Sequence, residues 1–557
     1  MQDKIDVKFP KSLNFKSIFF VKRSLRLFKL KRTLLAFFLI LASSSRHAEA
    51  SIVKDICHII ETKKSWPALD HPIDRAIARL YVLRDCRPYF HLKGKLLKKG
   101  YITARILGQS RQRGLLPSRY QYGSIYRRIK GPFKGQKAQL DILLTKALVR
   151  YILDLSIGVK ETTMLDQGAF PRVRHILQKV LESYDIERDI ERHALGHRFY
   201  ARLLRGAQIY DAAIKKVAKD PRGFYEIKEG EPFLREKVEK RLRLFSDLKG
   251  PSDPKKWQAA LKRFQKRHGL KEDGRPCKKT LRELNVHPRQ RFQTIAINLE
   301  RWRRLGGSPG GDDVVINLAA YHLSIYEKRR PVTSMKVVIG KNHKKTPQMV
   351  AKISLLALNP YWHIPASLVK SDIIPEILKN PSYLQKKGIK VYEHWQKNPK
   401  ILNLKRHEWL ALKTNSNPIS LRLTQKPGPQ NPLGRIKFEM PDTGGIYLHD
   451  TPFRGQFRFK KRNFSQGCLR LEDPVRLALH LLKREGLFYS GAHLLKKIKE
   501  GPTIRWQLKK PMPVYITYQT AWADKNGLVY FAKDNYGRDQ EEKKYFDFSS
   551  TSVLLGH

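Results

Sequence analysis

The sequence predicts a multidomain α+β protein, with a helical N-terminal half and a mainly β C-terminal part. Its 557 residues are enough for about three or four hydrophobic cores. Apolar residues recur at helical spacing in the first half, most clearly over Asp141–Asp154. The glycine-rich segment Gly306–Gly311 marks a boundary. Beyond it, short β-rich runs such as Val314–Ala319 and Met335–Gly340 alternate with turn residues.

Residues 1–50 are typical of an export segment rather than of a folded one. A basic flank precedes a short apolar run, Leu34–Ala42, and Ala48–Ala50 fits a small-x-small cleavage site. The apolar run is short for a membrane-spanning helix, so we expect a signal peptide, with an uncleaved N-terminal anchor as the alternative. Both interpretations predict that the bulk of the chain is exported.

Export determines how the four cysteines are interpreted. Cys57 and Cys86 lie close in sequence, and an oxidising compartment would let them pair, although the sequence leaves open whether they do. Cys277 has no neighbouring partner and is expected to be a small buried residue. No Cys-x-x-Cys or histidine-rich spacing supports a zinc site, so no metal is expected.

The net charge of +61 and the sequence pI near 10.3 favour polyanionic partners. Lysine and arginine are spread through every region rather than gathered in one stripe. No nucleic-acid fold signature accompanies them, and an exported protein meets little nucleic acid. We therefore expect no nucleic-acid partner, and an anionic envelope surface is the better interpretation of the charge.

Residues 51–245 are expected to form a helical scaffold domain, because apolar residues recur at helical spacing and no catalytic constellation appears. A linker helix is expected within 289–311, where Asn298–Arg304 continues the helical pattern up to the glycine-rich boundary.

Residues 250–288 are expected to be a separate small module. Trp257, Leu261 and Phe264 fall on one helical face and are interpreted as its core. Its string Ala260–Gly274 resembles the small three-helix peptidoglycan-binding domain.

Residues 312–521 are expected to form a mainly β domain with one interruption. The interruption, 366–433, is lysine-rich and has a helical pattern over Leu368–Leu378 and Tyr383–Trp395. An insertion of this size within the β domain, beside the strands expected to carry its active site, indicates a helical lid. A C-terminal extension, 522–557, follows.

Two segments of this β domain carry chemistry: Gly445–Pro452 and Ser465–Leu471. They pair one histidine, His449, with one cysteine, Cys468. A thiol with a pKa of about 8.5 is only slightly ionised at neutral pH, so a cysteine nucleophile needs a base. Ile446–Leu448 is expected to be a strand that ends at the histidine, and Asp473 and Pro474 are expected to begin a helix after the turn. Another histidine, His363, lies between Trp362 and Ile364 and is interpreted as structural.

This arrangement resembles the L,D-transpeptidases with a YkuD-type catalytic domain, and the whole chain resembles their large Gram-negative type. The family signature is a histidine followed, a loop later, by Ser/Thr-His-Gly-Cys, a hydrophobic residue and Arg or Asn. The matching residues are His449, Ser465, Gly467, Cys468 and Arg470. Gln466 departs from the family pattern, which most often has histidine at that position.

The resemblance and the residue chemistry together give a set of expected roles. Cys468 is the expected nucleophile, His449 the general base and acid, and Gly467 a backbone oxyanion donor. Arg470 is expected to bind a substrate carboxylate, and Tyr447 and Ser465 to line the substrate site. The resemblance implies a periplasmic enzyme with no cofactor that cleaves the bond after diaminopimelate in peptidoglycan stem peptides. It also implies D-Ala release, 3→3 cross-links and acylation by carbapenems.

Two other classes remain open from the sequence. A cysteine peptidoglycan hydrolase, acting as an L,D-carboxypeptidase, would use water instead of an amine to resolve the thioester. A non-catalytic wall-binding scaffold is the other, and Gln466 is its best support, whereas His449, Gly467 and Cys468 together oppose it. The acceptor also remains open between a wall stem and a lysine of an envelope protein.

Overall fold

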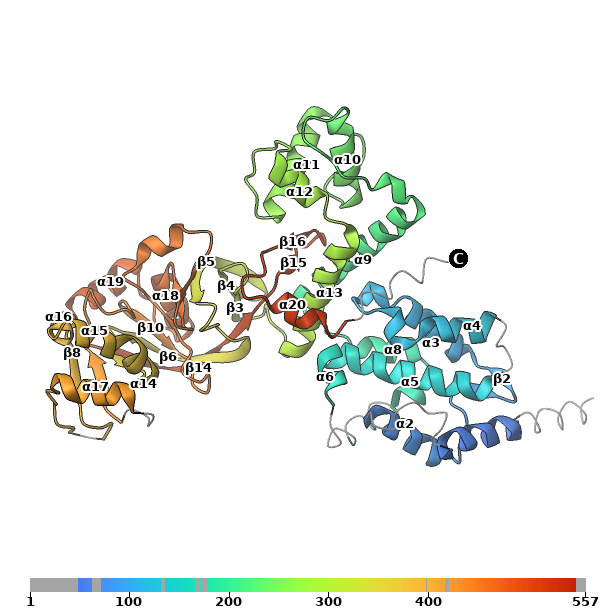
Figure 1. The fold of residues 1–557 in the computed structure, drawn as a ribbon, viewed down its shortest axis with the longest axis horizontal. Helices are drawn as coiled ribbons and strands as arrows, with labels where there is room; N and C mark the ends of the chain where they lie inside the picture. Colours follow the sequence, from blue (N-terminus) through green and yellow to red (C-terminus); the bar gives the residue numbers. More distant parts are fainter. Residues whose placement is uncertain are drawn as a thin grey trace, which may run out of the picture. The chain divides into compact units, whose positions relative to one another are not determined.

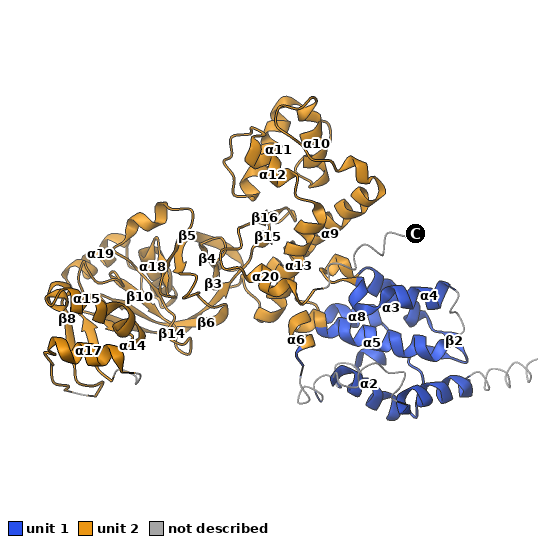
Figure 2. Cartoon of the chain, viewed as in Figure 1, with its two compact units in different colours: residues 1–109, 117–153, 164–193 blue, residues 110–116, 154–163, 194–557 orange. Residues whose placement is uncertain are grey.

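The computed structural model divides the chain into two compact units (Figures 1 and 2). It describes residues 49–62, 72–131, 136–165, 171, 174, 179–396, 398–415 and 420–546, so the predicted apolar run of the export segment lies outside the described residues. Unit 1 is helical, and unit 2 contains a mainly β part, which confirms the multidomain α+β prediction. No helix among these residues is long and apolar enough to span a membrane.

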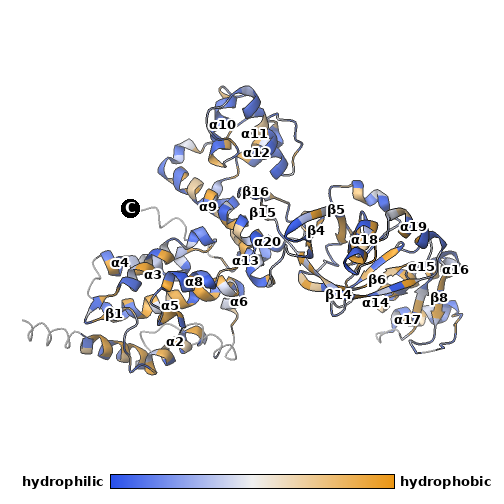
Figure 3. Cartoon of the chain, turned by 180° about the vertical axis from the view of Figure 1, so that it is seen from behind, coloured by the Kyte–Doolittle hydropathy of each residue, from blue (hydrophilic) through white to orange (hydrophobic). Residues whose placement is uncertain are grey.

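Unit 1 is built from helices around a buried carboxylate. The longest helix is α5, Lys137–Ser156, along which apolar residues concentrate (Figure 3). Its Asp141 is fully buried and accepts hydrogen bonds from the Tyr89 and Phe90 N–H groups and from the Tyr81 hydroxyl. The other main elements are α2 (Pro72–Val82), α3 (Lys98–Gly108), α4 (Tyr122–Lys130), α8 (Ile186–Arg192) and the hairpin β1–β2 (His91–Leu92, Lys95–Leu96).

A disulfide joins Cys57 to Cys86 in unit 1, which answers the question that the sequence left open. The sulfur atoms are 2.07 Å apart and the Cα atoms 5.4 Å apart. The bond connects the helical residues 49–61 to the chain just after α2.

Five α-helices of unit 2 lie between residue 194 and the β part. They are α9 (Arg198–Lys219), α10 (Leu234–Leu244), α11 (Pro254–Arg267), α12 (Lys278–Leu284) and α13 (Pro288–Leu305), and α11 and α12 among them belong to the predicted wall-binding module. Leu261 and Phe264 are fully buried, as predicted, whereas Trp257 is half-buried under the Arg235 guanidinium. Helix α10 packs against both α11 and α12, so it joins them although it lies before residue 250.

The prediction of a buried Cys277 is wrong. Cys277 is exposed because it is the N-cap of α12, where the chain turns into the helix at the module surface. The apolar side chains of α12 that fill the core, Leu281 and Leu284, come one turn later.

The β part of unit 2 is a sheet that closes on itself. Nine strands follow one another, and the second of them, β5, also pairs with the last, β4. In order across the sheet, they are β12 (Asn463–Ser465), β5 (Arg330–Gly340), β13 (Leu469–Leu471), β11 (Leu448–His449), β10 (Ile436–Glu439), β6 (Met349–Leu358), β14 (Ile504–Thr517), β3 (Asp313–Asn317) and β4 (His322–Glu327).

Helix α18, Pro474–Arg484, covers the core of this sheet. Its predicted start is confirmed: Asp473 is the N-cap, its side chain accepts a hydrogen bond from the Arg476 N–H, and Pro474 is the first helical residue. Leu477, Ala478, Leu481 and Leu482 are buried in the sheet core.

The insertion 366–433 is not purely helical, which corrects the predicted helical lid. Its helices are α14 (Ala366–Leu368), the π-helical turn η5 (Val369–Ile373), α15 (Ile374–Lys379), α16 (Tyr383–Lys387) and α17 (Arg406–Thr414). Its strands β8 (Ile389–Tyr392) and β9 (Arg422–Gln425) form a three-stranded sheet with β7 (Trp362–Ile364).

The predicted helix over Tyr383–Trp395 fails at Gly388. This glycine has a φ of +62°, which ends α16 in the left-handed region. Beyond it, Ile389 and Val391 are buried on one side of a strand, a period of two rather than 3.6. The insertion thereby gains its own core around Trp409, separate from that of the main sheet.

Candidate active site

Cys468 lies in a tight turn between β12 and β13. Gly467, the residue before it, has a φ of +122°, a conformation that favours glycine. The Ser465 hydroxyl donates to the Cys468 carbonyl oxygen at 2.6 Å and accepts from the Gly467 N–H at 3.1 Å. Ser465 was expected to line the substrate site, but it is buried and its hydroxyl is engaged in holding this turn.

The register between β11 and β13 places the candidate residues on one face of the sheet. The two strands are parallel, with Leu448 opposite Leu469 and His449 opposite Arg470. Both leucines are fully buried in the core. Because side chains alternate along a strand, His449 and Arg470 point to the opposite face. Tyr447 and Cys468 lie two residues before His449 and Arg470, respectively, and the Leu469 N–H donates to the Tyr447 carbonyl oxygen at 3.1 Å.

Lys437 belongs to the same face, and sequence reasoning missed it. It stands on β10 directly opposite His449. Its ammonium group lies 4.4 Å from the centre of the Tyr447 ring and 3.1 Å from a carboxylate oxygen of Glu439. Lys437 alternates with the apolar residues Ile436 and Phe438, which are buried. This alternation indicates that the Lys437 side chain points away from the core. Its partner strand was not visible in the sequence.

His449 is buried and held neutral. Burial lowers its pKa to about 3, and the positive charge of Arg470 acts in the same direction. Its Nδ1 atom lies 2.5 Å from the Asp450 carbonyl oxygen, and hydrogen bonding to the backbone of Asp450 and Leu433 opposes the shift. The imidazole is therefore unprotonated at neutral pH, which is the state that a general base requires.

The Cys468 thiol is half-buried and experiences opposing influences. Burial raises its pKa, whereas hydrogen bonding to Tyr447 and the charges of Lys437 and Arg470 lower it. The thiol also lies 3.5 Å from the Gly445 carbonyl oxygen, to which it donates. Burial and the nearby thiol raise the pKa of Tyr447 well above its ordinary value, so its phenol stays protonated.

Tyr447 thus contacts the Cys468 thiol directly, in addition to the lining role expected for it. Its ring lies 5.6 Å from the His449 ring. No hydrogen bond joins His449 to Cys468 within the described part of the chain. The structure therefore places Tyr447 beside both members of the predicted pair.

Arg470 has a protein partner on this face. One of its nitrogens, Nη1, donates to the Gln456 side-chain oxygen at 2.8 Å, and its guanidinium lies 5.5 Å from the Phe453 ring centre. The Nε atom is buried without a hydrogen-bond partner in the structure. Arg470 is therefore oriented beside Cys468 while retaining donor capacity.

Gln466, which departs from the family pattern, contacts the insertion. Its side-chain nitrogen donates to an Asp372 carboxylate oxygen on η5 at 3.0 Å. His363 faces the small sheet of the insertion, with Nδ1 3.0 Å from the Thr424 hydroxyl and its ring 5.7 Å from that of Trp395. His363 is therefore not part of the group around Cys468.

Comparison with known proteins agrees with this geometry. Residues 311–516 match the L,D-transpeptidase catalytic domain of the YkuD family, and residues 75–206 match a scaffold domain. A Haemophilus influenzae protein named "Putative L,D-transpeptidase" is 31% identical over 249 residues, which cover 45% of this chain and 48% of that protein. The match thus spans about half the length of this relative.

The stretch that matches the YkuD-type L,D-transpeptidase catalytic domain contains both His449 and Cys468, and the stretch that matches a scaffold domain precedes it in the same chain.

Proposed function

We propose that this protein is a peptidoglycan L,D-transpeptidase. Cys468 attacks the diaminopimelate carbonyl of a tetrapeptide stem, D-Ala leaves, and the acyl group passes to an acceptor amine to give a 3→3 cross-link. One observation carries the proposal: Lys437, His449 and Arg470 stand in register on one face of the sheet, next to Tyr447 and the Cys468 turn.

The protonation states of the residues in the site support this chemistry. His449 is neutral at neutral pH and can accept the thiol proton, and the resulting imidazolium can protonate the leaving amine. Lys437 and Arg470 stabilise the thiolate and any carboxylate of the stem peptide. The protonated Tyr447 hydroxyl hydrogen-bonds the Cys468 sulfur, and this hydrogen bond orients the sulfur toward the substrate carbonyl.

The oxyanion of the tetrahedral intermediate needs backbone donors. The Gly467 N–H, which the sequence analysis assigns to the oxyanion, donates to the Ser465 hydroxyl oxygen. The adjacent Cys468 N–H has no hydrogen bond to any described residue and is the donor that we assign to the oxyanion.

The remaining parts of the proposal concern location and accessory domains. We infer that the insertion excludes water from the thioester and that the helical module α10–α12 binds the wall. We also infer that the protein acts in the periplasm, as an exported chain, and the disulfide in unit 1 is compatible with an oxidising compartment.

A single reaction tests the proposal. Purified protein is incubated with a disaccharide-tetrapeptide, and the products are resolved by mass spectrometry beside a Cys468→Ala variant. Cross-linked dimer and free D-Ala, both absent with the variant, are expected. D-Ala and tripeptide without dimer would indicate a hydrolase, and the absence of both products would contradict the proposal.

A further inference from the structure

The backbone of the Cys468 turn is almost fully hydrogen-bonded. The Gly467 N–H and the Cys468 carbonyl are both bonded to Ser465, and the Gly467 carbonyl accepts a hydrogen bond at 2.7 Å from the Thr346 hydroxyl. Thr346 is fully buried and lies on the segment that follows β5. Within the described part of the chain, the Cys468 N–H is the one backbone polar group of the Gly467–Cys468 pair without a partner.

Thr346 controls that free N–H through the geometry of the peptide bond. The Gly467 carbonyl and the Cys468 N–H belong to one planar trans peptide group, so they point in opposite directions. When the Thr346 hydroxyl fixes the carbonyl oxygen, it also fixes the direction of the N–H. A hydrogen bond accepted by the carbonyl further polarises the amide and makes its N–H a stronger donor.

The Thr346 backbone is held by a segment that lies beyond the matched catalytic domain, which ends at residue 516. The Tyr536 hydroxyl donates to the Gly340 carbonyl at 2.7 Å and accepts from the Thr346 N–H at 3.4 Å. Arg538 donates to the Thr346 carbonyl at 2.9 Å. The Gly340 N–H donates to the Thr346 hydroxyl oxygen at 3.0 Å, so that the hydroxyl proton is directed to Gly467.

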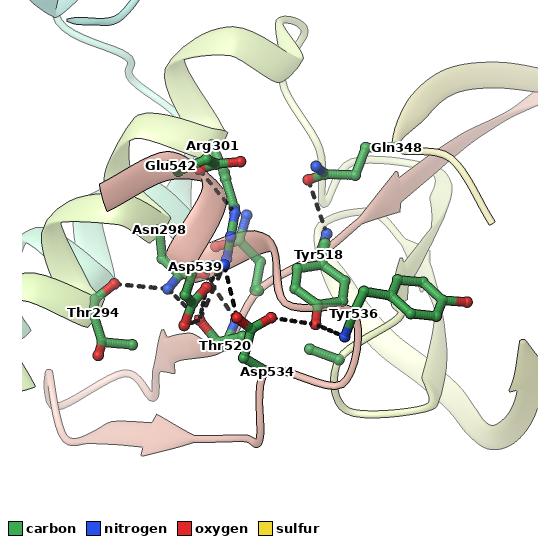
Figure 4. Close-up of polar contacts among 12 residues, drawn as sticks. Thr294, Asn298, Arg301, Gln348, Tyr518, Thr520, Asp534, Tyr536, Asp539 and Glu542 are labelled. Carbon is green, nitrogen blue, oxygen red and sulfur yellow. Dashed lines mark hydrogen bonds and ion pairs between the residues drawn. The ribbon is translucent and has the colours of Figure 1, made fainter. Parts of the chain in front are cut away.

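This C-terminal segment is itself anchored in a buried network (Figure 4). The Tyr518 hydroxyl accepts from the Tyr536 N–H at 2.8 Å and donates to Asp534 at 2.7 Å. Arg301, from α13, is fully buried and forms ion pairs with Asp539 at 2.7 Å and with Glu542 at 3.2 Å. The segment Asp534–Glu542 is therefore anchored near both of its ends, and the residues that contact Thr346 lie between these anchors.

We propose that Thr346 is a positioning residue for the oxyanion donor, and that the segment Asp534–Glu542 belongs functionally to the catalytic domain. Thr346 aims the Cys468 N–H at the developing oxyanion, and Tyr536 holds Thr346 in place. The inference rests on the proposed acyl-transfer function, because an oxyanion forms only when the thiolate adds to a carbonyl carbon.

The experiment compares two reactions of the same thiol. Acylation of Cys468 by a carbapenem adds sulfur to a carbonyl carbon and creates an oxyanion. Alkylation by iodoacetamide forms a sulfur–carbon bond at a methylene carbon and expels iodide, with no oxyanion. Both rates are measured by mass spectrometry on the full chain, in a Cys277→Ser background that removes the exposed second thiol.

Thr346→Val removes the hydroxyl while keeping the branched shape. We expect its acylation rate to fall by about 10- to 100-fold, because a displaced oxyanion donor costs much of its contribution, with alkylation changed by less than about 2-fold. Thr346→Ser keeps the hydroxyl and is expected to retain acylation within about 3-fold of the wild type. Tyr536→Phe removes the hydroxyl that contacts the Thr346 backbone but leaves the Thr346 hydroxyl in place. Its acylation rate is expected to fall by an amount between those of Thr346→Ser and Thr346→Val.

Four results would overturn the inference. A parallel fall of acylation and alkylation in Thr346→Val would show that the whole turn collapses. Unchanged acylation in that variant, or equal losses in Thr346→Ser and Thr346→Val, would show that the hydroxyl has no such role. A wild-type protein that alkylates but does not acylate would overturn the proposed function as well, which separates the two failures.

Discussion

The Cys468 thiol depends on a balance between burial and charge. Burial opposes ionisation, while Lys437, Arg470 and the Tyr447 hydroxyl favour the thiolate. The effect of burial is the larger one, so Cys468 and His449 are a neutral thiol and a neutral imidazole rather than an ion pair. A neutral Cys468 thiol is expected to react slowly with oxidants, because the thiolate is the reactive form.

The pH dependence of alkylation tests this balance. The pKa of Cys468 is raised, so the thiolate appears only at higher pH, and the iodoacetamide rate is expected to rise with a midpoint above about 8.5. In Lys437→Met the midpoint is expected to move further up, since a stabilising cation is lost. The measurement is made in the Cys277→Ser background, and a midpoint below the ordinary thiol value would contradict the assignment.

At the scale of elements, one hydrogen bond joins the cysteine turn to the insertion. Gln466 stands beside Gly467 and donates to Asp372 in η5, a π-helical turn of the kind that often marks functional segments. The residue that breaks the family pattern thus has a specific partner on the element expected to cover the site.

Removal of that partner is expected to loosen the insertion locally. Asp372→Ala should accelerate amide hydrogen exchange over Val369–Ile373 by about 2- to 10-fold, the range of one ordinary hydrogen bond. Glu376→Ala, which removes a neighbouring exposed carboxylate paired with Lys379, is the matched control and should leave η5 unchanged. Equal acceleration of exchange in both variants would mean that the hydrogen bond from Gln466 to Asp372 does not hold η5 in place.

At the scale of the whole molecule, the two units are expected to unfold as separate transitions, because each is compact by itself. The disulfide lies in unit 1 and closes a separation of 29 residues. A loop of this length is worth about 3–4 kcal/mol to the unit that contains it. Reduction should therefore lower the melting temperature of unit 1 alone, as measured by scanning calorimetry with and without a reductant.

The double variant Cys57→Ser/Cys86→Ser provides the control for that measurement. It should reproduce the melting profile of the reduced wild-type protein and be insensitive to the reductant. A shift of the unit 2 transition on reduction would contradict independent unfolding.

Buried histidines make unit 2 sensitive to acid. Burial lowers the pKa of His197 to about 4. Between pH 6.5 and 4, His197 is protonated in the unfolded chain but stays neutral in the folded protein, because its pKa is lower in the folded state. Stability therefore falls as the pH falls through this window, by about 1.4 kcal/mol per pH unit for one such group.

His197→Asn tests this linkage, because Asn can still accept the hydrogen bond that His197 receives as N-cap of α9. Thermal unfolding of unit 2 is followed at several pH values between 7 and 4.5. The variant should lose stability less steeply on acidification than the wild type, and parallel pH profiles would argue against a buried neutral His197.

The sequence alone determined the parts of this protein that local patterns encode. Helical and strand-like periods identified the helical half, the β domain and the Asp473–Pro474 helix start, because these depend on residues close in the chain. The His449 and Cys468 motifs were visible for the same reason. The insertion was only partly predicted, since the strands β8 and β9 gain their definition from pairing with each other and with β7.

Only the tertiary structure decided which distant residues act on the thiol and on its turn. Lys437 acts on the thiol, Thr346 bonds the turn and Tyr536 contacts Thr346, and nothing in their local sequence indicates these partners, which lie far away along the chain. Their roles arise from strand register, peptide-plane geometry and burial, which are properties of the closed sheet. The sequence by itself singled out Cys468 and His449 as the candidate nucleophile and base, whereas the tertiary structure decided their protonation and which backbone N–H beside the thiol is left without a partner among the described residues.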